Sequence, residues 1–233
     1  MNWMKKVAVA LVCLLPLGLQ AAKVDTLQVK SPSMNKSIEV VVVSPDMAAT
    51  EACPVIYLLH GYGGNARTWV GIKPDLPKIA DEKGIFFVCP DGKNTWYWDS
   101  PLNADVRYET FISDKLVKYV DSHYKTVADR KGRAITGLSM GGHGAMGNGL
   151  RHSDVFSAAG STSGGVDIRP FPKNWEMSVQ IGEKAKYPEN WEKYTVINLV
   201  PTLRKDQIAL IFDCGDSDFF LEVNKNYHEA LLK

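Results

Sequence analysis

The stretch Gly137-Leu138-Ser139-Met140-Gly141-Gly142 decides the fold of this 233-residue chain. A short apolar run that contains Ala134 and Ile135 precedes it, and a Gly/Ala-rich segment with helical character, 143–150, follows it. A serine placed this way in a Gly-x-Ser-x-Gly pattern is typical of a nucleophile elbow, a tight strand-to-helix turn that holds the hydroxyl above a sheet. Glycines flank such a serine because a Cβ there would collide with neighbouring backbone.

Outward from this turn, apolar runs alternate with segments of helical spacing. The runs predict strands near 24–29, 38–43, 55–59, 85–89, 133–138, 156–161 and 208–214. Helical spacing predicts helices that end before Gly84, near His123 and near Leu231. Strands that alternate with helices indicate an α/β fold, with a mainly parallel sheet covered by helices on both faces. We expect the sheet to begin with an antiparallel part.

Residues 1–22 differ from the rest of the chain. They begin with basic residues, continue as an apolar run over 7–19 and end in small residues. This pattern predicts a signal peptide cleaved near Ala21 or Ala22, and a secreted or periplasmic protein. The run is too short to span a bilayer stably, so a retained anchor is the weaker alternative and we expect no stable membrane anchor after processing.

The remaining chain, 23–233, has the length of one domain. Without the signal segment, the number of basic side chains falls from 27 to 25 and the number of acidic ones stays at 26. The net charge is then close to zero, so we expect no binding to nucleic acid. Its three cysteines are expected to be buried thiols, with a Cys53–Cys89 disulfide as the alternative. A segment rich in Pro, Lys and Trp, 166–207, lies between the last two predicted strands and is expected to form a lid-like insertion beside the site.

Ester or amide hydrolysis through a serine needs a nucleophile, an oxyanion hole, a base and an acid that orients the base. Ser139 is the predicted nucleophile. The backbone N–H of Met140, at the helix start, is one predicted oxyanion donor. The second is the N–H of Tyr62, within the glycine-rich loop 58–64 that follows an earlier strand.

The acid is expected after the strand near 208–214, because this fold uses the chain order Ser, then Asp. Asp218 is the predicted acid, since it stands beyond the turn at Gly215. Asp216 is the second candidate, and Asp213 is interpreted as structural.

None of the five histidines is expected to reach Ser139. Four of them lie on predicted helices, or at their ends, too far from Ser139: His123, His143, His152 and His228. The fifth, His60, is expected to pack under the oxyanion loop. We therefore expect the catalytic histidine to follow a further strand beyond Lys233, so that this chain is a C-terminally truncated copy of a complete enzyme that lacks the last strand and helix. The alternative is a non-catalytic binding protein that kept the fold.

A second aromatic motif, 90–100, follows the fourth predicted strand. Trp96, Tyr97, Trp98 and Asp99, together with His60, are predicted to line a substrate pocket, because ligand sites are mostly apolar with few polar groups. The alternative is a loop that plugs onto the domain. The Gly-x-Gly-x-x-Gly string at 142–147 is assigned to the elbow helix and not to a dinucleotide. No His or Cys pair has ligand spacing, so no metal and no cofactor are expected.

The combined motifs resemble the esterase D family of α/β-hydrolases, which includes tributyrin esterases, S-formylglutathione hydrolases and mycolyltransferases. The resemblance is carried by 58–64 with Trp69, by 90–100, by 108–111, by the Ser139 elbow and by 213–220. It implies an α/β-hydrolase fold and a serine carboxylesterase for short acyl or acetyl esters, such as those on polysaccharides. An acyltransferase that uses the same acyl-serine is the alternative. The resemblance also implies that the histidine lies in a further C-terminal segment, and it makes a small-molecule or carbohydrate ester the expected partner.

Overall fold

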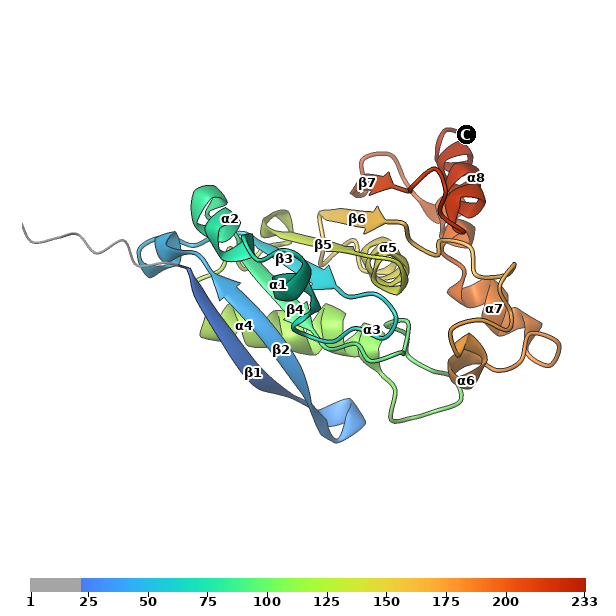
Figure 1. Cartoon of the computed structure of the whole chain (residues 1–233), viewed down its shortest axis with the longest axis horizontal. Coiled ribbons are helices and arrows are strands. Elements are labelled where there is room, and N and C mark those ends of the chain that lie inside the picture. The colour runs from blue at the N-terminus through green and yellow to red at the C-terminus, as the bar shows by residue number, and fades with distance from the viewer. Residues whose placement is uncertain (1–21) are drawn as a thin grey trace, which may run out of the picture.

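The computed structural model describes residues 22–233, and the predicted signal segment, apart from Ala22, lies outside the described residues (Figure 1). Seven strands form one sheet in the order β1-β2-β4-β3-β5-β6-β7. Their bounds are β1 Lys23–Ser31, β2 Lys36–Ser44, β3 Val55–Leu59, β4 Phe86–Pro90, β5 Arg133–Gly137, β6 Ala158–Thr162 and β7 Ala209–Asp213. The pairs β1–β2 and β2–β4 are antiparallel, and all later pairs are parallel. The predicted parallel sheet with an antiparallel start is confirmed.

Helices connect the strands. Their bounds are α1 Thr68–Ile72, α2 Leu76–Lys83, α3 Tyr108–Thr110, α4 Val117–His123, α5 Met140–Arg151, α6 Met177–Ile181, α7 Pro188–Tyr194 and α8 Leu221–Leu231. A π-helical segment, Phe111–Leu116, joins α3 to α4, so the helix predicted to end near His123 is continuous but locally widened. Short 3-10 segments occupy Pro32–Met34, Asp46–Ala49, Arg130–Gly132 and Val196–Thr202.

Both faces of the sheet are covered at β2, as the alternation of its side chains shows. Val40 and Val42 belong to one buried cluster, which includes side chains of α4, α5 and α8. Val41 and Val43 belong to a second cluster, against α2. Successive strand residues point to opposite faces, so a run of four valines supplies both cores. This is the α/β-hydrolase architecture predicted from the sequence.

The insertion 166–207 packs into the larger of these clusters. Ile168, Met177, Ile181 and Trp191 are completely buried, in the same cluster as the strands. The segment carries α6 and α7 and shares one core with the rest of the domain. Its role as a lid remains a prediction.

The sheet ends at β7 on the side away from β1. The Ile211 side chain on β7 is 77% exposed, although most strand residues of this size are buried. Cys53, Cys89 and Cys214 are free thiols, and the first two are buried, as the simpler interpretation of the sequence had it. No helix within the described part of the chain is long and apolar enough to cross a membrane.

Candidate active site

Ser139 occupies the turn between β5 and α5, where the sequence predicts it. Its backbone has φ 57° and ψ −115°, a conformation that L-residues rarely adopt. The Ser139 N–H donates to the Thr162 carbonyl at 2.9 Å, which ties the turn to the end of β6. Such strain persists only where the surroundings enforce it, and it is typical of functional turns.

Close backbone packing explains the glycines around the nucleophile. A Cβ on Gly141 would lie 2.2 Å from the Leu59 carbonyl oxygen, and one on Gly137 would lie 2.4 Å from the Gly141 backbone. A Cβ on Gly144 would lie 2.5 Å from the Tyr97 ring. Gly137, Gly141 and Gly144 thus let β5 and α5 approach their neighbours closely.

The loop after β3 lies directly against the nucleophile. A Cβ built on Gly61 would be 3.6 Å from the Ser139 Cβ. Within residues 22–233, the N–H groups of Tyr62 and Met140 donate to no backbone or side-chain acceptor. Met140 is also the first residue of the 12-residue helix α5, where the helix dipole favours negative charge. Both predicted oxyanion donors are therefore available near Ser139.

The three candidate acids stand at the end of β7 and in the loop that follows it. Asp218 is half-buried, and its Oδ1 accepts from the N–H of Phe220 at 2.7 Å, just before α8. Asp216 is exposed and accepts only from its neighbour Ser217, whereas Asp213 faces Thr162 across the β6–β7 pair. Asp218 is the most enclosed of the three, and its catalytic role remains a prediction.

His60 lies in the loop next to the elbow, and His143 lies four residues after Ser139. Both rings are buried, and both nitrogens of each ring are hydrogen-bonded within the core. The Gly92 N–H donates to His60 Nε2 at 2.9 Å, which leaves Nδ1 to donate to the Gly61 carbonyl at 2.8 Å. Trp98 Nε1–H donates to His143 Nε2 at 2.7 Å, so Nδ1 donates to the Gly165 carbonyl. Burial lowers the pKa of His143 to about 4.

The other three histidines have partners elsewhere. His123 stacks on Tyr119 at the end of α4, and His152 Nε2 lies 3.0 Å from a Glu109 carboxylate oxygen. His228 lies on α8, with its ring 6.2 Å from the Phe212 ring. Within residues 22–233, no histidine hydrogen-bonds to the Ser139 hydroxyl.

The aromatic segment after β4 forms a buried stack. Trp96 and Trp98 stack at 5.6 Å between ring centroids, and both meet the His143 ring edge-on. Tyr97 is completely buried, and its hydroxyl donates to the His60 carbonyl. The Asp99 carboxylate accepts from the N–H and hydroxyl of Thr110. This packing is that of a loop plugged onto the domain, the alternative interpretation of the sequence, and contact between these side chains and a substrate remains a prediction.

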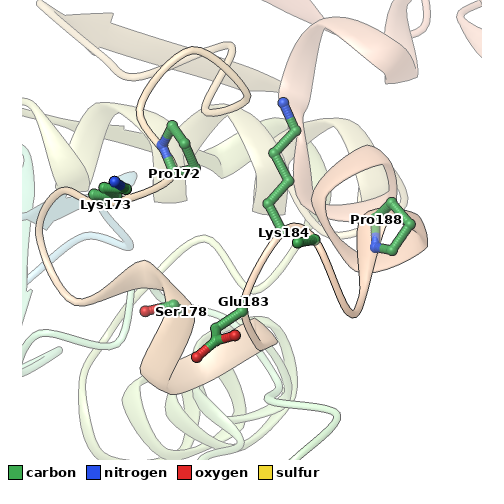
Figure 2. A pocket seen from close by; sticks show the side chains of 7 residues that line it. Pro172, Lys173, Ser178, Glu183, Lys184 and Pro188 are labelled. Carbon is green, nitrogen blue, oxygen red and sulfur yellow. The ribbon is translucent and has the colours of Figure 1, made fainter.

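The insertion contains a cavity of about 800 Å³ between the loops that flank α6 (Figure 2). Its walls include Pro172, Lys173, Ser178, Glu183, Lys184 and Pro188. Burial and the nearby Glu176 raise the pKa of the Tyr62 phenol in the oxyanion loop.

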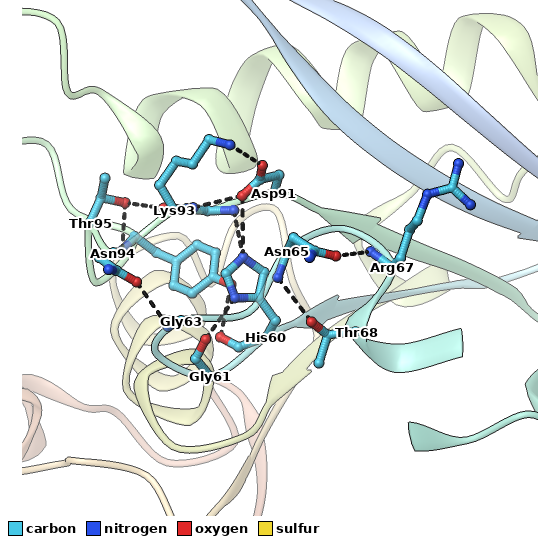
Figure 3. A network of polar contacts seen from close by, with 12 residues as sticks. His60, Gly61, Gly63, Asn65, Arg67, Thr68, Asp91, Lys93, Asn94 and Thr95 are labelled. Carbon is cyan, nitrogen blue, oxygen red and sulfur yellow. Dashed lines mark hydrogen bonds and ion pairs between the residues drawn. The ribbon is translucent and has the colours of Figure 1, made fainter. Parts of the chain in front are cut away.

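A polar network underlies the oxyanion loop, and the sequence analysis did not identify it (Figure 3). Asp91, at the end of β4, pairs with Lys93 Nζ at 2.6 Å and lies 3.6 Å from His60 Nε2. Burial opposes the charged form, but the Lys93 ammonium and the Lys93 N–H outweigh it and hold the pKa of Asp91 well below its ordinary value. Asn94 Oδ1 accepts from the Gly63 N–H at 2.9 Å. The signal was present in the polar run 91–95, which directly follows a buried strand.

The family model described as "Putative esterase" matches residues 31–231. The chain belongs to this family. The expected resemblance to esterase D-like proteins is confirmed at this level, together with the fold.

Two curated relatives are esterases. Esterase Rv1288 of Mycobacterium tuberculosis is 30% identical over 149 residues, which cover 61% of this chain and 32% of that protein. The chain thus spans about a third of that relative's length. An acetyl esterase of Caldicellulosiruptor saccharolyticus is 25% identical over 200 residues, which cover 78% of this chain and 72% of the relative.

Two solved structures share the fold. A ferulic acid esterase superposes with a TM-score of 0.74 at 28% identity and covers 91% of this chain and 86% of its own. An S-formylglutathione hydrolase from Agrobacterium tumefaciens has a TM-score of 0.72 at 23% identity, with 90% of this chain and 81% of its own covered. At that identity the second match shows the fold alone.

Proposed function

We propose that this chain belongs to an exported serine carboxylesterase that hydrolyses short acyl or acetyl esters through an acyl-serine intermediate. The observation that carries the proposal is the backbone of Ser139, held at φ 57° beside the two available N–H groups of Tyr62 and Met140. A structural serine has no need of this strained turn, whereas a nucleophile that must stand clear of the sheet does.

In the proposed reaction the Ser139 oxygen attacks the ester carbonyl while a base takes its proton. The Tyr62 and Met140 N–H groups donate to the oxyanion of the tetrahedral intermediate, and the α5 dipole supports the same charge. The protonated base then gives its proton to the departing alcohol. Water hydrolyses the acyl-serine by the same steps, and Asp218 orients the base and stabilises its charged form.

The base is proposed to come from a histidine outside residues 22–233. His60 and His143 use both ring nitrogens within the core, so neither can accept the Ser139 proton without losing buried hydrogen bonds. The uncovered face of Ile211 at the β7 edge, next to the Asp218 loop, supports a position for a further strand there.

The substrate class is proposed from the relatives and the site. The acetyl esterase and the ferulic acid esterase both act on esters by name, and the similarity to the acetyl esterase favours an ester with a short acyl group. Export is proposed from the signal-like segment 1–22 alone. A carbohydrate ester outside the cell fits both the proposed substrate class and the proposed export.

The test compares two proteins: the 233-residue chain and a version extended through the downstream reading frame. We expect the extended protein to hydrolyse p-nitrophenyl acetate and its Ser139→Ala variant to lose this activity. The 233-residue chain should stay near the background rate, because loss of a triad member costs several orders of magnitude in rate. Lys78→Ala, at a side chain that is 75% exposed on α2, is the control for nonspecific damage. Full turnover by the 233-residue chain, or activity that survives Ser139→Ala, would contradict the proposal.

A further inference from the structure

A second polar cavity of about 470 Å³ opens on the same edge of the sheet as Ser139 but away from the nucleophile. Charged and aromatic side chains line it, among them Lys36, Glu39, Arg67, Asp91, Lys93 and Tyr108. The volume is within the range of about 300–1,000 Å³ for small-molecule pockets. Nothing in the proposed acyl transfer uses these residues.

The strand order sets the separation between this cavity and the nucleophile. Asp91 follows β4, and Lys36 begins β2, which is antiparallel and therefore starts where the parallel strands end. β4 lies two strands from β5 and β2 lies three. At about 4.8 Å per strand, the cavity is about 10–14 Å from Ser139 along the sheet edge.

The charged side chains that line the cavity leave one cation without an ion-pair partner, and the Asp105 carboxylate acts on it only from outside the lining. Lys93 pairs with Asp91 at 2.6 Å, and Arg67 Nε faces Glu39 at 3.9 Å. Lys36 Nζ instead donates to the Asp105 carbonyl at 3.0 Å and lies 5.1 Å above the centre of the Tyr108 ring. No carboxylate in residues 22–233 forms an ion pair with Lys36. The cavity therefore favours an anion near Lys36.

A second observation points to a ligand at the same place. The Tyr108 hydroxyl is buried and has no hydrogen-bond partner within the described residues, which is costly for a polar group. Burial raises the pKa of Tyr108 to about 12, so the phenol keeps its proton and can donate. An oxygen-rich ligand would supply the acceptor that the protein does not.

We propose that this cavity binds the carboxylate of a hydroxylated ligand, a uronic acid residue, between Lys36 and Tyr108. Lys36 supplies the charge, Tyr108 supplies a donor, and the paired carboxylates of Asp91 and Glu39 accept from ligand hydroxyls. A link to catalysis rests on the proposed function. If the ligand is part of the ester substrate, that substrate is an acidic oligosaccharide whose uronate lies two or three sugar units from the ester.

The test is a titration followed by amide NMR, which requires no turnover and so can succeed or fail independently of the esterase proposal. The probes are D-glucuronate, D-glucose as its neutral match and inorganic phosphate. We expect glucuronate to shift amides of the cavity, 36–39 and 91–93, with glucose and phosphate weaker. Equal binding of glucose, stronger binding of phosphate, or no saturable shift with glucuronate would overturn the assignment.

Variants locate the site. Lys36→Gln is expected to weaken glucuronate about tenfold, the usual effect of losing a charged hydrogen bond. Tyr108→Phe removes only the unpartnered hydroxyl and is expected to weaken it a few fold while the fold is kept. Lys83→Gln, at the end of α2 on the opposite edge of the sheet, is the matched control and should change nothing. Unchanged affinity in Lys36→Gln, or an equal loss in Lys83→Gln, would overturn the site.

Discussion

Trp98 Nε1–H donates to His143 Nε2 at 2.7 Å inside the core, so the imidazole is held neutral as a hydrogen-bond acceptor. Burial lowers the pKa of His143 to about 4, whereas an unfolded chain keeps it near 6.5. Between these two values the unfolded state binds more protons than the folded state. The free energy of unfolding should therefore fall as the pH drops from about 6.5 to 4, by about 3 kcal/mol in total from this residue.

Urea unfolding at a series of pH values measures this slope. In His143→Gln the decrease over this window should be smaller, because the titrating group is gone while an acceptor for Trp98 remains. His123→Gln, on an exposed ring at the end of α4, is the control for loss of a histidine outside the core. An identical slope in wild type and His143→Gln would show that His143 does not titrate as its burial requires.

Gly141→Ala tests the close packing of α5 under the nucleophile. The added Cβ would lie 2.2 Å from the Leu59 carbonyl oxygen, and backbone on both sides must move to relieve it. We expect a loss of about 2–4 kcal/mol in the free energy of unfolding, measured by urea denaturation. Gly71→Ala, in α1 with no heavy atom within 4 Å of the new Cβ, should be neutral or stabilising by up to about 1 kcal/mol. Equal effects of the two substitutions would contradict the packing argument.

The sequence predicts the strands and the nucleophile turn well because both depend on local signals. Runs of β-branched residues such as 40–43 favour strands, and the glycines on either side of Ser139 identify the turn together with the apolar run before it and the helical segment after it. The hydrogen bond between Trp98 and His143 cannot be predicted from a local sequence pattern, since the two residues are 45 positions apart. The cavity at Lys36 and Asp91 likewise depends on the pairing of β2 with β4, which no local pattern specifies.

Asp218→Asn tests the acid assignment in the extended protein. If Asp218 orients the base, its amide should lower kcat by about four orders of magnitude, as loss of a triad acid does elsewhere, with little change in KM. Asp216→Asn is the matched control, because this exposed carboxylate accepts only from Ser217. Hydrolysis of p-nitrophenyl acetate gives both constants. A larger loss in Asp216→Asn than in Asp218→Asn would reverse the assignment.

Ser139→Gly measures the strain at the elbow. Glycine adopts φ 57° with ψ −115° more readily than serine, so the variant should gain about 1 kcal/mol in the free energy of unfolding. Ser139→Ala keeps the Cβ, and therefore the strain, and should stay within about 0.5 kcal/mol of wild type. Urea denaturation of the two variants side by side gives the comparison. If glycine and alanine are equally stable, the turn stores no strain.

The β7 edge predicts self-association of the 233-residue chain. Ile211 is 77% exposed on the edge strand of the sheet, and unpaired strand edges with apolar side chains are sites of aggregation. We expect Ile211→Lys to reduce light scattering during concentration, because a charge on an edge strand opposes pairing with a second chain. Val179→Lys is the control, since this side chain is 65% exposed but lies on helix α6, away from any strand edge. Equal improvement by both substitutions would attribute the effect to net charge, and no improvement by Ile211→Lys would remove the β7 edge as the site of association.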